Sequence, residues 1–273
     1  MSFEAARAEV DDRLDWRRGA EFPTRRLAVL IDADNTSPRI ASPLFAEVAK
    51  IGEASVRRIY GDFSGTRLKA WADILSRHGM IPRQQFACAK GKNASDIALV
   101  IDAMDLLHSG RFDGFCLVSS DSDFTRLAAR IREEGTDVFG FGAKKTPESL
   151  VQACRRFIYT ETLLAPAEPA PDGNSDGGPN GKAAGSIDRP AAKPPGAALA
   201  ILERIIADLD QGDGWVNLSN VGDRLAKHAP GFDPRTYGHK RLGDLVKATN
   251  AFDLVTAATS GTRIRRKAAR NRG

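Results

Sequence analysis

The fold is decided by Leu27-Ala-Val-Leu-Ile-Asp-Ala-Asp-Asn35, which joins an unbroken apolar run to a polar end. An apolar run of this length is typical of a strand that is buried on both faces, as in a parallel sheet. Asp32, Asp34 and Asn35 follow at once, where the strand would leave the sheet. The stretch therefore predicts a parallel α/β sheet with a polar binding site at the carboxyl end of its first strand.

Strands and helices alternate after this stretch. Further strands are predicted at residues 55–60, 80–85, 114–118, 136–141 and 157–159. Helices are predicted at residues 38–51, 66–78, 95–107, 124–131 and 148–153. This alternation favours a parallel sheet with helices on both faces. We therefore predict an α/β domain over residues 25–163, preceded by an N-terminal arm over residues 1–24.

The composition changes after the α/β domain. Residues 164–197 are rich in Ala, Pro and Gly and nearly lack large apolar side chains, which predicts a disordered linker that lets two domains move independently. Residues 198–267 are apolar at helical spacing again, and two short strands are predicted at 252–255 and 262–266. Three helices and a hairpin predict a small winged-helix domain, followed by a basic tail over residues 268–273.

The bulk composition limits the class of protein. The 273 residues are 42% hydrophobic and carry a net charge of +5, as expected of a globular protein with a mild preference for polyanionic partners. Three widely spaced cysteines fit neither a zinc site nor a disulfide framework, and we expect Cys116 in the core. No apolar leader and no run of about 18 apolar residues is present. We expect a cytoplasmic protein without a membrane partner.

A second acidic motif follows the predicted strand at 114–118. The stretch Ser119-Ser-Asp-Ser-Asp-Phe124 places Asp121 and Asp123 after that strand, and Asp96 begins the helix after the third strand. Ligands of open parallel sheets bind beyond the carboxyl ends of the strands, where the strand order reverses. We expect Asp32, Asp96, Asp121 and Asp123 to meet there. Gathered carboxylates need a positive charge, and a hard cation such as Mg²⁺ or Mn²⁺ suits oxygen ligands.

A metal at this edge would support phosphodiester hydrolysis, because a bound cation lowers the pKa of a coordinated water and stabilises charge on a phosphoryl oxygen. We expect Asp32 and Asp121 to bind the metal directly, and Asp96 and Asp123 to complete its coordination or hold waters. Asn35 would orient the scissile phosphate or Asp32. An alternative stays open for Asp96 and Asp123, because either aspartate could be a helix cap.

Nucleic-acid contacts are predicted near the acidic edge and in the second domain. Lys90 and Lys92 precede Asp96 in a loop and could bind phosphates, with a plain solvated loop as the alternative. Ser120 could contact the metal or a phosphate through its hydroxyl group.

The predicted winged-helix domain carries a second set of candidate nucleic-acid contacts. The Tyr237 ring could stack on a base, or it could pack in the core. The basic residues near the third helix could face phosphates or form a solvated face; they are Arg235, His239, Lys240 and Arg241.

Three stretches of the first domain carry a resemblance to a known family. They are Leu30–Asn35, the run from Lys90 to Leu99 with its continuation along the helix to Asp105, and Ser119–Phe124. On these motifs, residues 25–160 resemble an NYN domain of the LabA-like type, a branch of the PIN-like nuclease superfamily. The resemblance implies a metal centre for RNA cleavage, and its four aspartates are all present as Asp32, Asp96, Asp121 and Asp123.

The second domain resembles another family. The residues that carry the likeness are Gly214–Ser219, Val221-Gly222, Leu225, Pro230–Asp233, Tyr237-Gly238 and Leu242–Leu245. Residues 197–267 are on this basis similar to an OST-HTH domain, also called LOTUS. The resemblance implies a winged-helix fold that binds RNA, with a protein partner in some members. The pairing of the two domains is itself a recurring arrangement.

These patterns predict a metal-dependent ribonuclease, cutting single-stranded or structured RNA internally, with a tethered RNA-binding module. A non-catalytic RNA-binding adaptor is one alternative. A haloacid-dehalogenase-like phosphatase is another, because Asp32-x-Asp34-x-Thr36 fits its first motif and Asp121 and Asp123 could be its later acidic pair. Asn35 in place of glycine, and the helix that begins near Asp96, favour the nuclease.

Overall fold

The structure is a computed structural model that describes residues 24–84, 94–164, 193–210, 212–257 and 261–267. The predicted arm and basic tail, and most of the predicted linker, lie outside the described residues. Among the described helices, none combines the length and the apolar character that crossing a bilayer requires.

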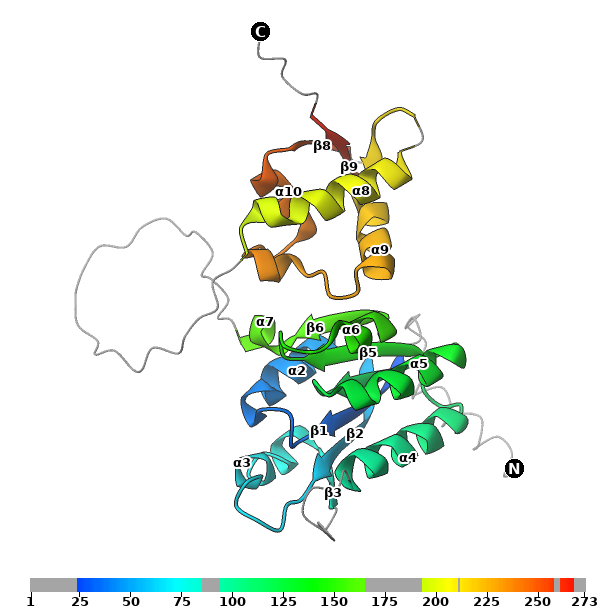
Figure 1. Cartoon of the computed structure of the whole chain (residues 1–273), viewed down its shortest axis with the longest axis vertical. Coiled ribbons are helices and arrows are strands. Elements are labelled where there is room, and N and C mark those ends of the chain that lie inside the picture. Colours follow the sequence, from blue (N-terminus) through cyan, green and yellow to red (C-terminus); the bar gives the residue numbers. More distant parts are fainter. Residues whose placement is uncertain (1–23, 85–93, 165–192, 211, 258–260, 268–273) are drawn as a thin grey trace, which may run out of the picture.

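Six parallel strands form the sheet of the first domain, in the order β3-β2-β1-β4-β5-β6 (Figure 1). Their bounds are Arg26–Asp32 for β1, Glu53–Gly61 for β2, Ile81–Gln84 for β3, Gly114–Val118 for β4, Asp137–Gly142 for β5 and Arg156–Tyr159 for β6. Strand β1 pairs with β2 on one side and with β4 on the other, so the strand order reverses between β1 and β4. The predicted parallel α/β sheet is confirmed.

Helices cover both faces of this sheet (Figure 1). They are α2 (Ala41–Val48), α3 (Lys69–Ala72), α4 (Ala94–His108), α5 (Thr125–Glu133), α6 (Glu148–Ala153) and α7 (Thr160–Leu164). Short 3-10 turns add η3 (Pro38–Ile40), η4 (Ser76–His78) and η5 (Ser122–Phe124). Strands and helices alternate as the sequence predicts.

Two of the predicted helices are shorter or more divided than expected. The helix predicted over 38–51 splits into η3 and α2. The helix predicted over 66–78 contains only α3 and η4, because the backbone between them closes tighter turns, such as Ile74 N to Trp71 O at 3.1 Å. Helical spacing of apolar residues cannot distinguish such turns from an α-helix.

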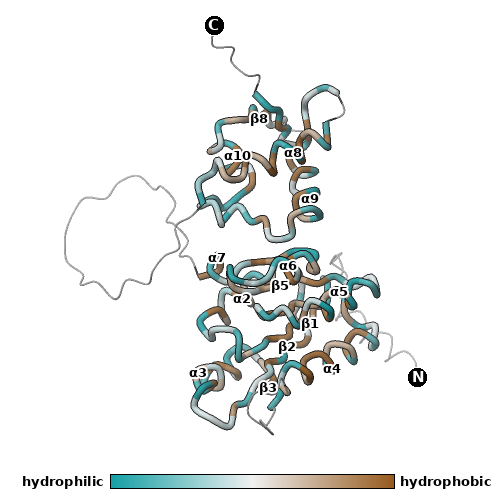
Figure 2. Tube along the Cα trace, viewed as in Figure 1, coloured by the Kyte–Doolittle hydropathy of each residue, from teal (hydrophilic) through white to brown (hydrophobic). Residues whose placement is uncertain are grey.

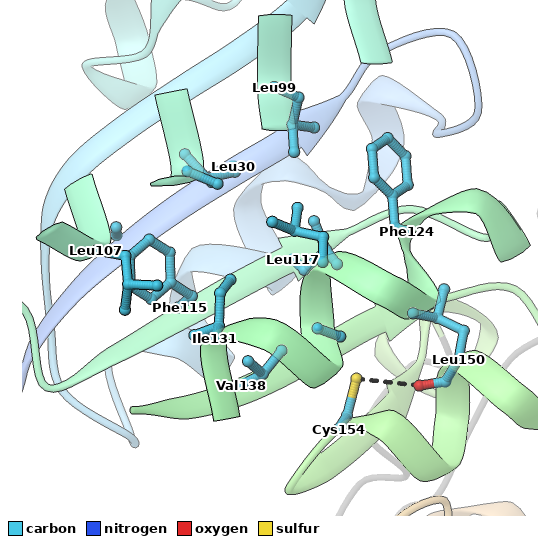
Figure 3. Close-up of a cluster of buried hydrophobic side chains, with 14 of the residues drawn as sticks. Leu30, Leu99, Leu107, Phe115, Leu117, Phe124, Ile131, Val138, Leu150 and Cys154 are labelled. Carbon is cyan, nitrogen blue, oxygen red and sulfur yellow. Dashed lines mark hydrogen bonds between the residues drawn. The ribbon is translucent and has the colours of Figure 1, made fainter. Parts of the chain in front are cut away.

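The core lies in two layers, one on each face of the sheet, and hydrophobic stretches run through both the sheet and α4 (Figure 2). Alternate residues of β1 point to opposite layers: Leu30 packs under α4 and α5, whereas Val29 and Ile31 pack under α2. The first of these layers includes Leu99, Leu117 and Phe124 (Figure 3). Cys116 is fully buried, as predicted.

The second domain is a three-helix unit with a small sheet. Its helices are α8 (Leu199–Leu209), α9 (Leu218–His228) and α10 (Leu242–Thr249), with 3-10 turns η6 (Pro195–Ala198) and η7 (Pro234–Tyr237). The strands β7 (Val216–Asn217), β8 (Phe252–Ala257) and β9 (Gly261–Arg266) form an antiparallel sheet in the order β7-β9-β8. The predicted helices and hairpin are present, and β7 is an addition too short to show a periodicity.

Candidate metal centre

Asp32 lies where the strand order reverses, at the end of β1, and is 1% exposed. Its Oδ2 atom accepts hydrogen bonds from Ser119 Oγ and from Asn35 Nδ2, both at 2.7 Å. Its Oδ1 atom accepts weaker bonds from the backbone N–H groups of Asp34 and Asn35, at 3.2 and 3.3 Å. Because Ser119 directly follows β4, Asp32 is fixed by both strands that flank the reversal.

The charge of Asp32 has no basic partner among the ion pairs of the described residues. Its hydrogen-bond donors are all neutral groups, from Ser119, Asn35 and the backbone. Burial raises the pKa of Asp32, and the bonds from Ser119 and Asn35 oppose that rise only in part. A buried carboxylate without a cation is costly, and a bound metal ion would relieve that cost.

Asp121 and Asp123 occupy the turn after β4. Asp121 is the N-cap of η5, and its Oδ1 accepts from Asp123 N at 2.9 Å. Asp121 N donates to Ser119 Oγ at 3.1 Å, so one hydroxyl group links Asp121 to Asp32. The alternative that Asp123 caps this helix is wrong, because Asp121 takes that place and Asp123 is exposed in the first turn.

Asp96 lies in the first turn of α4, where the sequence places it, inside the helix rather than at its cap. The pKa of Asp96 is raised to about 6, first by burial and then by the charges of Asp32, Asp121, Asp34 and Asp123. Asp96 therefore shares one electrostatic environment with the other acidic residues at the carboxyl edge of the sheet.

The carboxylates are gathered, but they do not form a closed cage. Among the residues that the structure describes, no three His, Cys, Asp or Glu side chains converge closely enough to hold a metal ion. The oxygen donors still suit a hard cation, since Mg²⁺ usually keeps several waters and binds to only one or two carboxylates.

The raised pKa of Asp96 gives a testable pH dependence. The pKa of Asp96 in the folded protein is about 6, above the ordinary aspartate value of 3.8. The protonated carboxyl group therefore stabilises the fold at low pH, and this stabilisation is lost as the pH rises from 3.8 to about 6. In EDTA, we expect Asp96 by itself to lower the free energy of unfolding by about 1–2 kcal/mol between about pH 4 and pH 7, after allowance for solvent screening. Urea titrations of the wild type and Asp96→Asn at several pH values would measure this change in the free energy of unfolding.

The Asp96→Asn variant is the reference, because other carboxylates titrate over the same range. We expect its stability to fall less than that of the wild type across this range. Equal slopes for the two proteins would contradict the raised pKa.

Asp34 has partners that the sequence did not predict. Its carboxylate pairs with the Arg67 guanidinium and accepts a 3.3 Å bond from Ser95 Oγ. The loop after β1 is thereby joined to the start of α4, close to Asp96. Arg67 is 33 residues away along the chain and stands in no motif, so nothing in the sequence indicated this contact.

The predicted nucleic-acid contacts near the edge stay predictions. Ser120 Oγ accepts from Ala143 N at 2.8 Å, which holds the loop after β5 against the turn after β4. Its hydroxyl hydrogen can still be donated to a ligand. Lys90 and Lys92 lie outside the described residues.

In the second domain, the basic residues divide into two groups. Lys240 and Arg241 are exposed, as a phosphate contact requires. Arg235 is instead paired with the carboxylates of Asp233 and Glu47, so the expectation that it faces phosphates is wrong.

The Tyr237 ring is half-buried in the second domain. It packs against Phe232 with ring centroids 5.5 Å apart, and burial raises the pKa of its hydroxyl group. The contact favours the core alternative for this ring, while part of it remains accessible.

The open parallel sheet with aspartates at its strand reversal, and the winged-helix unit joined to it, are the features expected of a PIN-like nuclease domain with an RNA-binding module. The comparisons with known proteins agree. The chain belongs to the NYN domain family, which matches residues 26–163, and the OST-HTH/LOTUS domain matches residues 193–264.

The remaining comparisons were made with curated proteins and with solved structures. No curated protein matches the chain. Four chains among the solved structures match, including a protein of unknown function from Vibrio parahaemolyticus RIMD 2210633. That protein is 18% identical with a TM-score of 0.45, over 51% of this chain and 94% of that chain.

Proposed function

We propose that the chain is a divalent-metal-dependent ribonuclease that cuts RNA internally, with the OST-HTH domain as its RNA-binding module. The observation that carries the proposal is the burial of Asp32, a carboxylate that no cationic side chain compensates among the described residues. Its position at the strand reversal is where open parallel sheets bind ligands.

The four carboxylates would have two roles in binding the metal. Asp32 and Asp121, joined through Ser119, would hold Mg²⁺ or Mn²⁺ directly. Asp96 and Asp123 would complete the coordination or hold waters. When bound, the metal would supply an activated water and would stabilise charge on the scissile phosphate. Asn35 donates to Asp32 Oδ2 and so holds that carboxylate in place.

Basic residues in both domains would bind the RNA substrate. Lys90 and Lys92 precede Asp96 in the sequence, and Lys240 and Arg241 are exposed on the OST-HTH domain. The net charge of +5 agrees with a polyanionic substrate. Because the module belongs to the same chain, RNA bound to it is held at a high local concentration near the nuclease domain.

The phosphatase alternative is disfavoured by the match of residues 26–163 to the NYN family. Its chemistry would use Asp32 as a nucleophile. The sequence has Asn35 where the phosphatase motif would have glycine. A non-catalytic adaptor is the second candidate, because the described side chains include no ready-made group of three metal ligands.

A cleavage assay on matched RNA and DNA strands tests the proposal. With Mg²⁺ or Mn²⁺, we expect the full chain to produce internal cuts in RNA, and excess EDTA should lower the rate by at least about 10³-fold. Cleavage that persists in EDTA would contradict the metal mechanism. RNA binding without cleavage under all metal conditions would favour the adaptor instead.

A further inference from the structure

The OST-HTH domain lies against the outer edge of the NYN sheet, beside β6 and α6 (Figure 1). A backbone hydrogen bond, a buried ion pair and a close glycine contact join the two domains there. We propose that this is a built docking surface, on which the OST-HTH domain is held in one fixed orientation instead of moving freely on its linker.

The backbone contact covers an exposed strand edge. Strand β6 is the last strand of the sheet, so no strand of the described residues lies on its outer side. Phe157 N, in the middle of this strand, donates to Pro230 O of the OST-HTH domain at 2.8 Å. Unpaired edge strands bind other chains readily, and proteins often cover them with a loop. The turn at Pro230 does this here.

The ion pair fixes the orientation of the docked domain. Glu47, at the end of α2, has a side chain that is only 5% exposed. Arg235 reaches it with both terminal nitrogens, Nη1 to Oε2 at 3.1 Å and Nη2 to Oε1 at 3.2 Å. Two parallel hydrogen bonds restrict the orientation of the guanidinium group relative to the carboxylate, as well as the distance between them. The same arginine binds Asp233, which is 4% exposed, so the pairing is built into both domains.

Docking adds a cation to the surroundings of Glu47. Burial alone would raise the pKa of this carboxyl group, but Lys50 and Arg235 together hold it below its ordinary value. Within the NYN domain, Glu47 also pairs with Lys50 Nζ at 2.7 Å and with Arg156 Nη2 at 3.6 Å. Separation would return Glu47 and Arg235 to water, so this ion pair contributes more to the orientation of the docked domain than to the strength of docking.

Close packing at Gly231 completes the surface. A Cβ atom at this position would lie 2.9 Å from Tyr159 Oη and 3.1 Å from Val151 Cγ1, both in the NYN domain. The backbone of the OST-HTH domain therefore rests directly on β6 and α6. A large side chain at this position, such as leucine, would have to displace Tyr159 and Val151 or move the domains apart.

The docking contacts are separated from the acidic residues across the sheet. They run along β6, from Arg156 at its start, which contacts Glu47, to Tyr159 at its end, which lies beside Gly231. Asp32 and Asp121 lie at or after the carboxyl ends of β1 and β4, and β5 stands between β4 and β6. If the proposed nuclease function holds, the docked domain would stand to one side of the acidic residues.

Amide exchange at Phe157 tests the docking in the full chain, without RNA or metal. We expect the Phe157 amide of the wild type to be protected, and Gly231→Leu to speed its exchange about tenfold or more. Gly196→Leu is the matched control, because a Cβ atom at Gly196 would meet nothing within 4 Å. Amides of the central strand β4 should keep their protection in every variant.

A second variant acts from the other side of the interface. We expect Glu47→Gln to speed exchange at Phe157 as well, because it removes the charge that Arg235 binds while leaving the OST-HTH sequence unchanged. Glu203→Gln is its control, since Glu203 pairs with Arg266 inside the OST-HTH domain. X-ray scattering should show a larger radius of gyration for both docking variants than for both controls.

Two results would overturn the docking. One is a Phe157 amide that exchanges in the wild type as fast as in Gly231→Leu. The other is a wild-type scattering curve that matches those of both docking variants. Neither measurement uses nuclease activity, so failure of the proposed function would not affect them.

Discussion

Asp32→Asn lowers the rate of RNA cleavage by at least about 10³-fold and leaves the fold intact, if Asp32 binds the catalytic metal. The amide keeps the size of the side chain but loses the negative charge. Ser119 Oγ and Asn35 Nδ2 both donate to Oδ2, and the amide oxygen can occupy that place. Its NH₂ group would then face only the weaker backbone donors, at 3.2 and 3.3 Å.

The stability of this variant should change little. Loss of the two weak bonds is offset by removal of a buried charge, so we expect the free energy of unfolding in EDTA to stay within about 1 kcal/mol of the wild type. Asp105→Asn is the matched control, because Asp105 is exposed on α4 and carries the same charge.

Steady-state cleavage of a labelled RNA and its binding by fluorescence anisotropy would be measured together. We expect Asp32→Asn to retain or improve RNA binding, since it removes a negative charge near the phosphates. Activity equal to that of Asp105→Asn would exclude Asp32 as a metal ligand.

Trp71→Ala is expected to lower the free energy of unfolding by about 3–5 kcal/mol. Trp71 is 1% exposed in the core layer under α2 and α3, so its removal would leave a large cavity. Its Nε1 donates to Thr36 O at 3.2 Å, and Thr36 Oγ1 donates to Asp32 O at 2.5 Å. The ring therefore supports the loop that carries Asp34 and Asn35, and cleavage should weaken with stability.

Trp71→Phe separates the two contributions of this residue. It keeps most of the ring volume and loses the Nε1 bond, which should cost about 1–2 kcal/mol. Urea denaturation of the three proteins would measure both changes. Losses of equal size in the Ala and Phe variants would mean that the lost hydrogen bond, and not the cavity, causes most of the destabilisation.

The sequence was most informative where one residue type dominates a short run. The apolar stretches of β1 and β4, each followed by aspartates, indicated both the central strands and the edge where ligands bind. Parallel strands end at the same edge of a sheet, so these two motifs could be placed at one edge. That β1 and β4 are neighbours is shown by the structure. Asp96 was placed by the same logic, from the helix that follows the third strand.

Contacts between distant segments could not be predicted in this way. Arg235 was expected at phosphates, but it binds Glu47, which is 188 residues away. Asp34 and Arg67 are another such pair. Asp121, and not Asp123, caps η5 because of where the backbone turns after β4. A turn two residues later would have made Asp123 the cap. Local periodicity carries no information about these choices.

Because Pro230 and Gly231 rest on the NYN domain, residues inserted at two places in the chain should have different effects. Residues added to the segment 165–192 would cost little, about 0.6 kcal/mol for each doubling of its length. A residue inserted between Gly231 and Arg235 would instead move the guanidinium away from Glu47 while Pro230 stays on β6. Transfer of this OST-HTH domain to another NYN domain should therefore depend on the edge strand and on α2 of the recipient, and hardly on the linker.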